Sequence, residues 1–107
     1  MSMTTYRMNS SCTTAGKYWI WGAVCWEAHA TGLRMLQIYL NGTTIIARTR
    51  IEAVDTAAHP TEHQIVCEYE LSATDYVELR VFQNSGGALD VEDQNEMGPV
   101  FGMRRVG

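Results

Sequence analysis

The dipeptide Asn41-Gly42, set between two apolar runs, constrains the fold more than any other feature of the chain. The flanking residues, 36–40 and 43–47, are rich in Leu, Ile and Thr. Asn-Gly supplies the positive φ angles of a type I′ turn, which joins two antiparallel strands. We therefore predict a β-hairpin. Its second strand continues to Ile51, with one face formed by Ile45, Ala47, Thr49 and Ile51 and the other by Ile46, Arg48 and Arg50.

Further segments predict strands, and helical periodicity is nearly absent. Between residues 17 and 26, both the even-numbered and the odd-numbered positions carry apolar residues, so both faces of a strand here would be apolar. This pattern predicts a strand that is covered on one face by an opposing sheet and on the other by a neighbouring subunit. Residues 63–71 alternate a core face with an acidic face, and 75–84 follow after a short turn as their pairing partner. Residues 88–91, after a Gly-Gly corner, and 99–106 add two more strands. The pattern predicts an all-β sandwich.

Size and charge limit the classes of function. The chain has 107 residues, which predicts one domain, and a net charge of −4. Arg104-Arg105 is the only basic doublet and is expected at a solvated strand end, so we predict no nucleic-acid binding. The apolar run from Tyr18 to Trp26 is far shorter than the ~20 residues of a membrane span. We therefore expect a soluble domain without membrane insertion.

Residues able to carry chemistry are present but are not arranged in known motifs. Cys12, Cys25 and Cys67 form no Cys-x-x-Cys pair, which predicts free thiols in the core. Pro60 interrupts the spacing between His59 and His63, which favours a loop histidine and a strand histidine over a zinc site. The serines lack a Gly-x-Ser-x-Gly elbow. We predict no enzymatic activity, with a hydrolase as the distant alternative.

Several segments together resemble a known family. They are Ala15-Gly16-Lys17-Tyr18-Trp19-Ile20, Thr31-Gly32-Leu33-Arg34, the hairpin described above, and the run from Leu71 through Tyr76-Val77-Glu78-Leu79. The pattern resembles the jelly-roll module of complement globular heads and tumour necrosis factors, particularly the versions in bacteriophage virion proteins. The resemblance covers about residues 16–107 and implies a single homotrimeric jelly-roll domain. Modules of this kind usually open with an additional strand, and only residues 1–14 precede the first motif here, so we expect either a shortened first strand or a chain that is a piece of a longer fibre protein.

The resemblance also implies where subunits and ions would bind. In a three-fold jelly roll the face toward the axis carries aromatic side chains, and the candidates here are either Trp19 and Trp21 or Tyr76 and Phe82. Some members of the family bind calcium near the trimer apex, for which the candidate ligands are Asp90, Asp93 and Glu96. We favour a solvated acidic loop there and predict no cofactor.

The function implied by the resemblance is structural and non-enzymatic. We expect the receptor-binding head of a phage tail fibre or spike, made in the host cytoplasm, incorporated into the virion and contacting other virion proteins or a host surface glycan or protein. A trimeric capsid decoration protein is the alternative, and a soluble bacterial binding module is a further one. The fibre hypothesis predicts a chain that is the end of a longer protein, whereas the decoration hypothesis predicts a complete short chain.

Overall fold

The computed structural model describes residues 7–11, 14–26, 32–52, 61–84 and 99–107. This part of the chain forms strands and no helix. The strands are β1 (Arg7–Ser11), β2 (Gly16–Trp26), β3 (Leu33–Leu40), β4 (Thr44–Glu52), β5 (Thr61–Leu71), β6 (Tyr76–Gln83) and β7 (Val100–Arg105). The predicted all-β class is confirmed for these residues.

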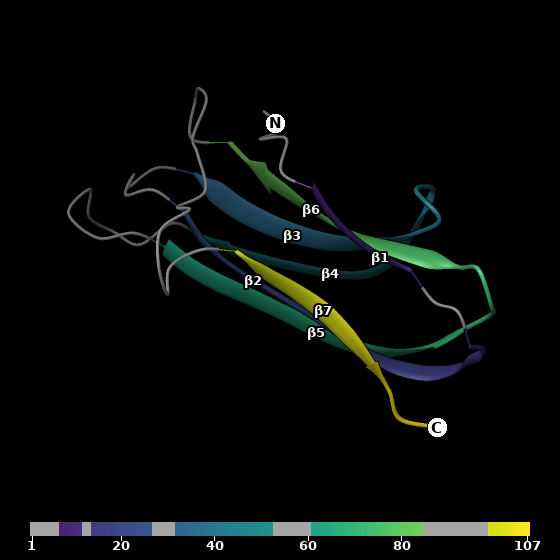
Figure 1. Ribbon diagram of the computed structural model, residues 1–107. Coiled ribbons are helices and arrows are strands. Elements are labelled where there is room, and N and C mark those ends of the chain that lie inside the picture. The colour runs from purple at the N-terminus through teal and green to yellow at the C-terminus, as the bar shows by residue number, and fades with distance from the viewer. Residues whose placement is uncertain (1–6, 12–13, 27–31, 53–60, 85–98) are drawn as a thin grey trace.

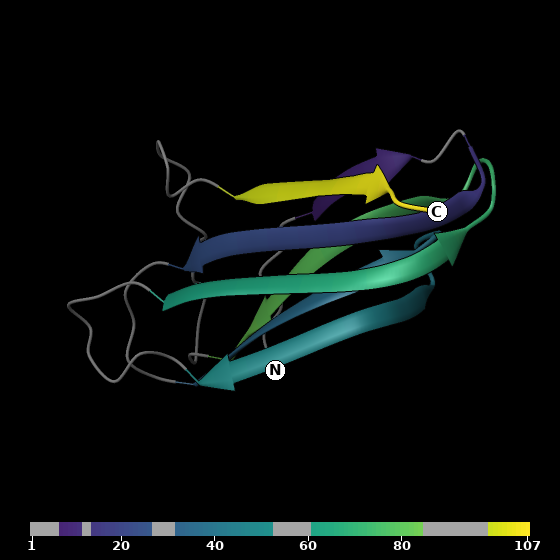
Figure 2. The ribbon, with the colours of Figure 1, turned by 90° about the horizontal axis from the view of Figure 1, so that it is seen from below.

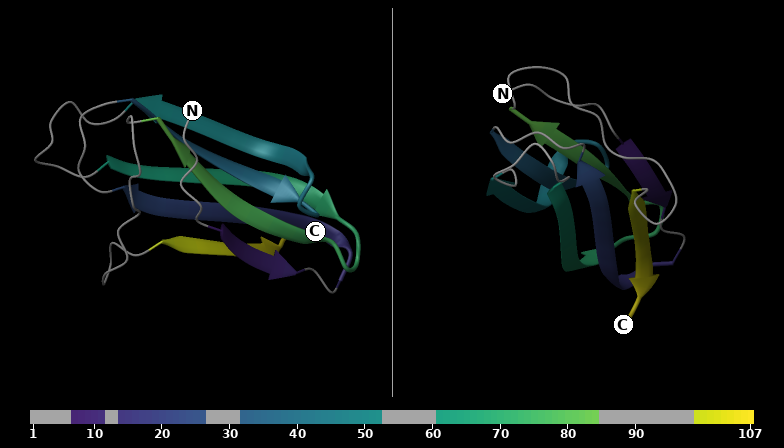
Figure 3. Two further views of the ribbon diagram at one scale, coloured as in Figure 1. Left: turned by 90° about the horizontal axis from the view of Figure 1, so that it is seen from above. Right: turned by 90° about the vertical axis from the view of Figure 1, so that its left-hand side faces the viewer.

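The strands form two antiparallel sheets that lie face to face as a sandwich (Figure 1). One sheet has the order β1-β6-β3-β4, and the other has the order β5-β2-β7. Figure 2 shows β7, β2 and β5 side by side with the larger sheet behind them, and the left view of Figure 3 shows the larger sheet in front. Each sheet therefore has one face toward the core and one face away from the other sheet.

The core lies between the sheets and follows the two-residue alternation of the strands. On β6, Val77, Leu79 and Val81 are completely buried, while the residues between them belong to the outer face. On β2, Ile20 and Val24 point into the same core. Each fully buried aliphatic side chain contributes roughly 1.5–3 kcal/mol of hydrophobic stabilisation, so these central strands hold the two sheets together.

The hairpin at Asn41-Gly42 is confirmed, although the β3–β4 connection also includes Thr43, because Leu40 pairs with Thr44. Asn41 and Gly42 have φ angles of 53° and 76°, and the Thr43 amide donates to the Leu40 carbonyl at 3.2 Å. A type I′ turn requires positive φ at both central positions, and Asn and Gly tolerate it best.

One detail of the predicted hairpin is wrong, because β4 contains a bulge. Ile38 pairs with Ala47 but Tyr39 pairs with Ile45, which leaves Ile46 as an extra residue. Beyond the bulge the alternation is reversed. Ile46 therefore packs against the core, whereas Ile45 lies 46% exposed on the outer face.

The predicted pairing of residues 75–84 with residues 63–71 is also wrong. After a turn in which Asp75 N donates to Ser72 O at 3.1 Å, β6 crosses to the other sheet and pairs with β1 and β3. Alternation shows which face of a strand is apolar but not which strand lies beside it. The predicted strand 88–91 and its glycine corner lie outside the described residues, and the predicted strand 99–106 is confirmed as β7.

Candidate functional site

The outer face of the three-stranded sheet carries a cluster of exposed apolar side chains. Cross-strand partners share one face of a sheet, and the register pairs Trp21 with Val66 on one side and with Gly102 on the other. One row further along, Ala23 pairs with Val100. We call this surface the tryptophan face; its large exposed members are Trp19, Trp21, Val66 and Val100.

The two tryptophans are the dominant members of this face. Trp19 is 53% exposed and Trp21 is 38% exposed. Trp21 lies over Gly102, since a Cβ atom built on that glycine would be only 2.7 Å from Trp21 Cζ2. The missing side chain lets the indole lie against the strand backbone and keep its other face toward solvent. Contiguous apolar patches of this kind mark interaction surfaces, and tryptophan is enriched at their energetic centres.

The two predicted pairs of interface aromatics do not lie together. Trp19 and Trp21 are on β2, whereas Tyr76 and Phe82 are on the outer face of β6 in the other sheet and are only partly exposed. Tyr76 is also held by backbone hydrogen bonds, because its amide donates to Asn41 Oδ1 at 3.0 Å and its carbonyl accepts from the Asn41 amide at 2.8 Å. The greater exposure of the tryptophans favours their face as the candidate binding surface.

Asn41 and Asp75 tie together two turns at one end of the sandwich. Asn41 Nδ2 donates to Asp75 Oδ1 at 3.1 Å, and the Ser72 amide donates to Asp75 Oδ2 at 2.8 Å. These two hydrogen bonds lower the pKa of Asp75, because both stabilise the charged carboxylate. The hydrogen bond from Asn41 has the larger effect and that from Ser72 the smaller one. Asn41 therefore both forms the hairpin turn and joins it to the β5–β6 turn.

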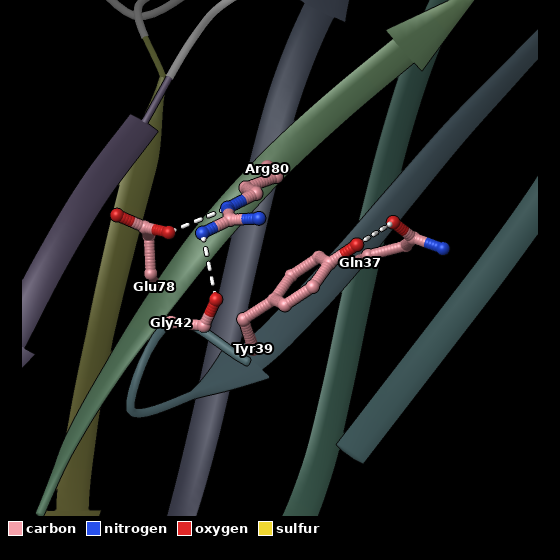
Figure 4. Close-up of polar contacts among 5 residues, drawn as sticks. All are labelled: Gln37, Tyr39, Gly42, Glu78 and Arg80. Carbon is pink, nitrogen blue, oxygen red and sulfur yellow. Dashed lines mark hydrogen bonds and ion pairs between the residues drawn. The ribbon is translucent and has the colours of Figure 1, made fainter. Parts of the chain in front are cut away.

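The outer face of the larger sheet carries a polar cluster around Arg80 (Figure 4). The guanidinium carbon lies 3.9 Å from the centre of the Tyr39 ring, Nε donates to Glu78 at 2.5 Å, and Nη2 donates to the Gly42 carbonyl at 3.2 Å. The Tyr39 hydroxyl donates to Gln37 Oε1 at 3.1 Å. Much of the hydrogen-bonding and stacking capacity of Arg80 is thus used within the fold, which makes this cluster a structural anchor for the hairpin.

Polar side chains are also buried in the core, at the end of the sandwich where β2 ends and β3 begins. Arg34 is completely buried, donates from Nη1 to the Leu33 carbonyl at 3.1 Å and lies 5.8 Å from the ring centre of Trp26. Burial lowers the pKa of Arg34. His63 Nε2 lies 3.4 Å from Thr49 Oγ1. The sequence named Arg34 only as part of the Thr31-Gly32-Leu33-Arg34 motif and did not predict its burial, because a charged residue at a strand start is normally solvated.

His63 is a core histidine, as its place in the alternation predicted. It is 6% exposed, and burial lowers its pKa from 6.5 to about 4. The ring is therefore neutral at neutral pH. Within the described ranges, Nδ1 has no hydrogen-bond partner. The other half of the predicted histidine pair, His59, lies outside the described residues.

The remaining candidates for chemistry are placed as follows. Cys25 is buried, Cys67 is half-buried, and neither forms a disulfide bond with another described residue. Burial raises the pKa of the Cys67 thiol. Cys12 and the possible calcium ligands Asp90, Asp93 and Glu96 lie outside the described residues. In the part of the chain that the structure describes, no group of three or more His, Cys, Asp or Glu side chains is arranged to hold a metal ion, and no helix is long and apolar enough to cross a membrane.

Comparison with known proteins adds no relative. The chain matches no protein-family model, and no curated protein matches it.

Proposed function

We propose that this protein is a non-enzymatic assembly module that forms a homotrimer through the tryptophan face. The observation that carries the proposal is the exposure of Trp19 and Trp21 on one sheet face, beside the exposed Val66. Burying such a surface in a subunit contact would remove apolar area from water, at about 25 cal/mol for each Å².

The strand order supports a jelly roll as the finer fold. Counting β1 to β7 as the second to eighth strands of an eight-stranded jelly roll reproduces both sheet orders, with the first strand missing beside β7. The motif pattern of the sequence also resembles that of trimeric phage modules. We therefore propose that the trimer is the receptor-binding head of a tail fibre or spike.

The mass in solution tests the assembly. Light scattering at micromolar concentration should give about three times 12.0 kDa, and Trp19→Arg together with Trp21→Arg should give a folded monomer. Ile45→Arg is the matched control, because Ile45 is 46% exposed on the outer face of the other sheet. A folded wild-type monomer would refute the proposal.

Location in the particle tests the role. Immunogold labelling of phage particles purified from the source of the chain should place it at fibre tips. Labelling distributed over the capsid lattice would instead assign it to capsid decoration, and no labelling of particles would refute a virion role.

A further inference from the structure

The tryptophan face carries opposite charges along its two sides. The outer face of β5 presents Glu62, Glu68 and Glu70 and no basic residue. The outer face of β7 presents Arg104 and no acidic residue. The surface is therefore acidic along the β5 edge and carries a basic residue on the β7 edge, with the apolar side chains of β2, and Lys17 at one end of that strand, between them.

One row of the sheet contains all three kinds of side chain. Trp19 pairs with Glu68 on β5 and with Arg104 on β7, so the row reads acid, tryptophan, base. Arg104 forms no ion pair with any described residue. Glu68 has only a long contact to Lys17, 4.0 Å between Nζ and Oε1, with both side chains about half exposed. Such a contact contributes little stability, so both charges remain available to a partner.

We propose that Glu68 of one copy pairs with Arg104 of the next across the tryptophan face, in the head-to-tail contact that the proposed trimer requires. This inference rests on the proposed self-association. In a ring closed by heterologous contacts, each copy offers its β5 side to one neighbour and its β7 side to the other. That arrangement brings Glu68 toward Arg104, whereas a contact between two β5 sides would place carboxylates against carboxylates. The flanking indoles exclude water, which strengthens the attraction between the charges.

Charge reversal tests the pairing. Glu68→Arg alone and Arg104→Glu alone should each raise the dissociation constant of the assembly by about tenfold or more at about 50 mM salt, and the double variant should restore it. Analytical ultracentrifugation measures these constants, and the single-variant effects should shrink at about 500 mM salt. Arg50→Glu and Glu52→Arg are the matched controls, since both residues are exposed on β4 in the other sheet and should leave assembly unchanged.

The outcomes separate this inference from the proposed function. Suppose that the tryptophan variants dissociate the assembly but the double reversal does not restore the affinity that the single reversals lose. The Glu68–Arg104 pairing is then wrong, and the tryptophan interface is still supported. Single reversals with no effect lead to the same conclusion. If the tryptophan variants leave the assembly intact, the interface itself is wrong and the pairing fails with it. Thermal unfolding of each variant shows whether any loss comes from the contact of Glu68 with Lys17 inside one chain.

Discussion

Acidification will destabilise this protein through the buried imidazole of His63. Burial lowers the pKa of His63 from 6.5 to about 4 in the folded protein. The unfolded chain therefore binds a proton on this residue more readily than the folded chain does. Stability from the neutral ring is fully present above pH 6.5 and is lost as the pH falls toward 4, below which His63 causes no further loss.

The size of the effect follows from the two pKa values. The difference between 6.5 and about 4 corresponds to roughly 3 kcal/mol of folding free energy, at 1.36 kcal/mol for each pKa unit. Domains of this kind are stable by about 5–15 kcal/mol in total. His63 should therefore account for a large share of the acid sensitivity of the fold.

Chemical denaturation at a series of pH values measures this contribution. The double variant His63→Leu with Thr49→Val removes both members of the 3.4 Å contact and leaves neither polar group unpaired, which limits its cost at neutral pH. Between about pH 7 and pH 4 the wild type should lose roughly 3 kcal/mol more than this variant. The carboxylates titrate in both proteins and cancel in the comparison. Equal losses in the two proteins would refute the argument that His63 is buried in the neutral form.

Three further outcomes are expected. Gly42→Val should lower the melting temperature by several degrees, because a β-branched residue at a φ of 76° costs about 1–2 kcal/mol, while Thr43→Ser should hardly change it; equal effects would mean that the turn is misplaced. Gly102→Val should displace the Trp21 ring, whose Cζ2 lies 2.7 Å from the new Cβ position, and change the near-UV circular dichroism, so an unaltered spectrum would contradict the close packing. Millimolar calcium should leave the melting temperature unchanged. A calcium site in the acidic loop would instead be shown by an increase of more than about 5 °C that magnesium does not produce and that Asp93→Asn abolishes.

The candidate site was predictable only in part. Apolar residues at both the even and the odd positions of residues 17–26 predicted that β2 has a second apolar face. In the structure, Trp19 and Trp21 lie exposed on that face. The sequence supported the alternative pair, Tyr76 and Phe82, equally well as candidates for the trimer interface. Exposure depends on which strands lie above a side chain, and that information is absent from a one-dimensional pattern.

The sequence by itself determined the local features of this protein. Asn41-Gly42 specifies a hairpin because few dipeptides tolerate two successive positive φ angles, and the alternation of β5 sets its core face through the pleat of the strand. Only the tertiary structure decided that β6 leaves β5 for the other sheet, that a bulge turns Ile45 outward, and that Arg34 is enclosed. Backbone hydrogen bonds between strands are the same whatever the side chains, so they do not determine which strands pair. The packing of the whole sandwich determines which strands become neighbours.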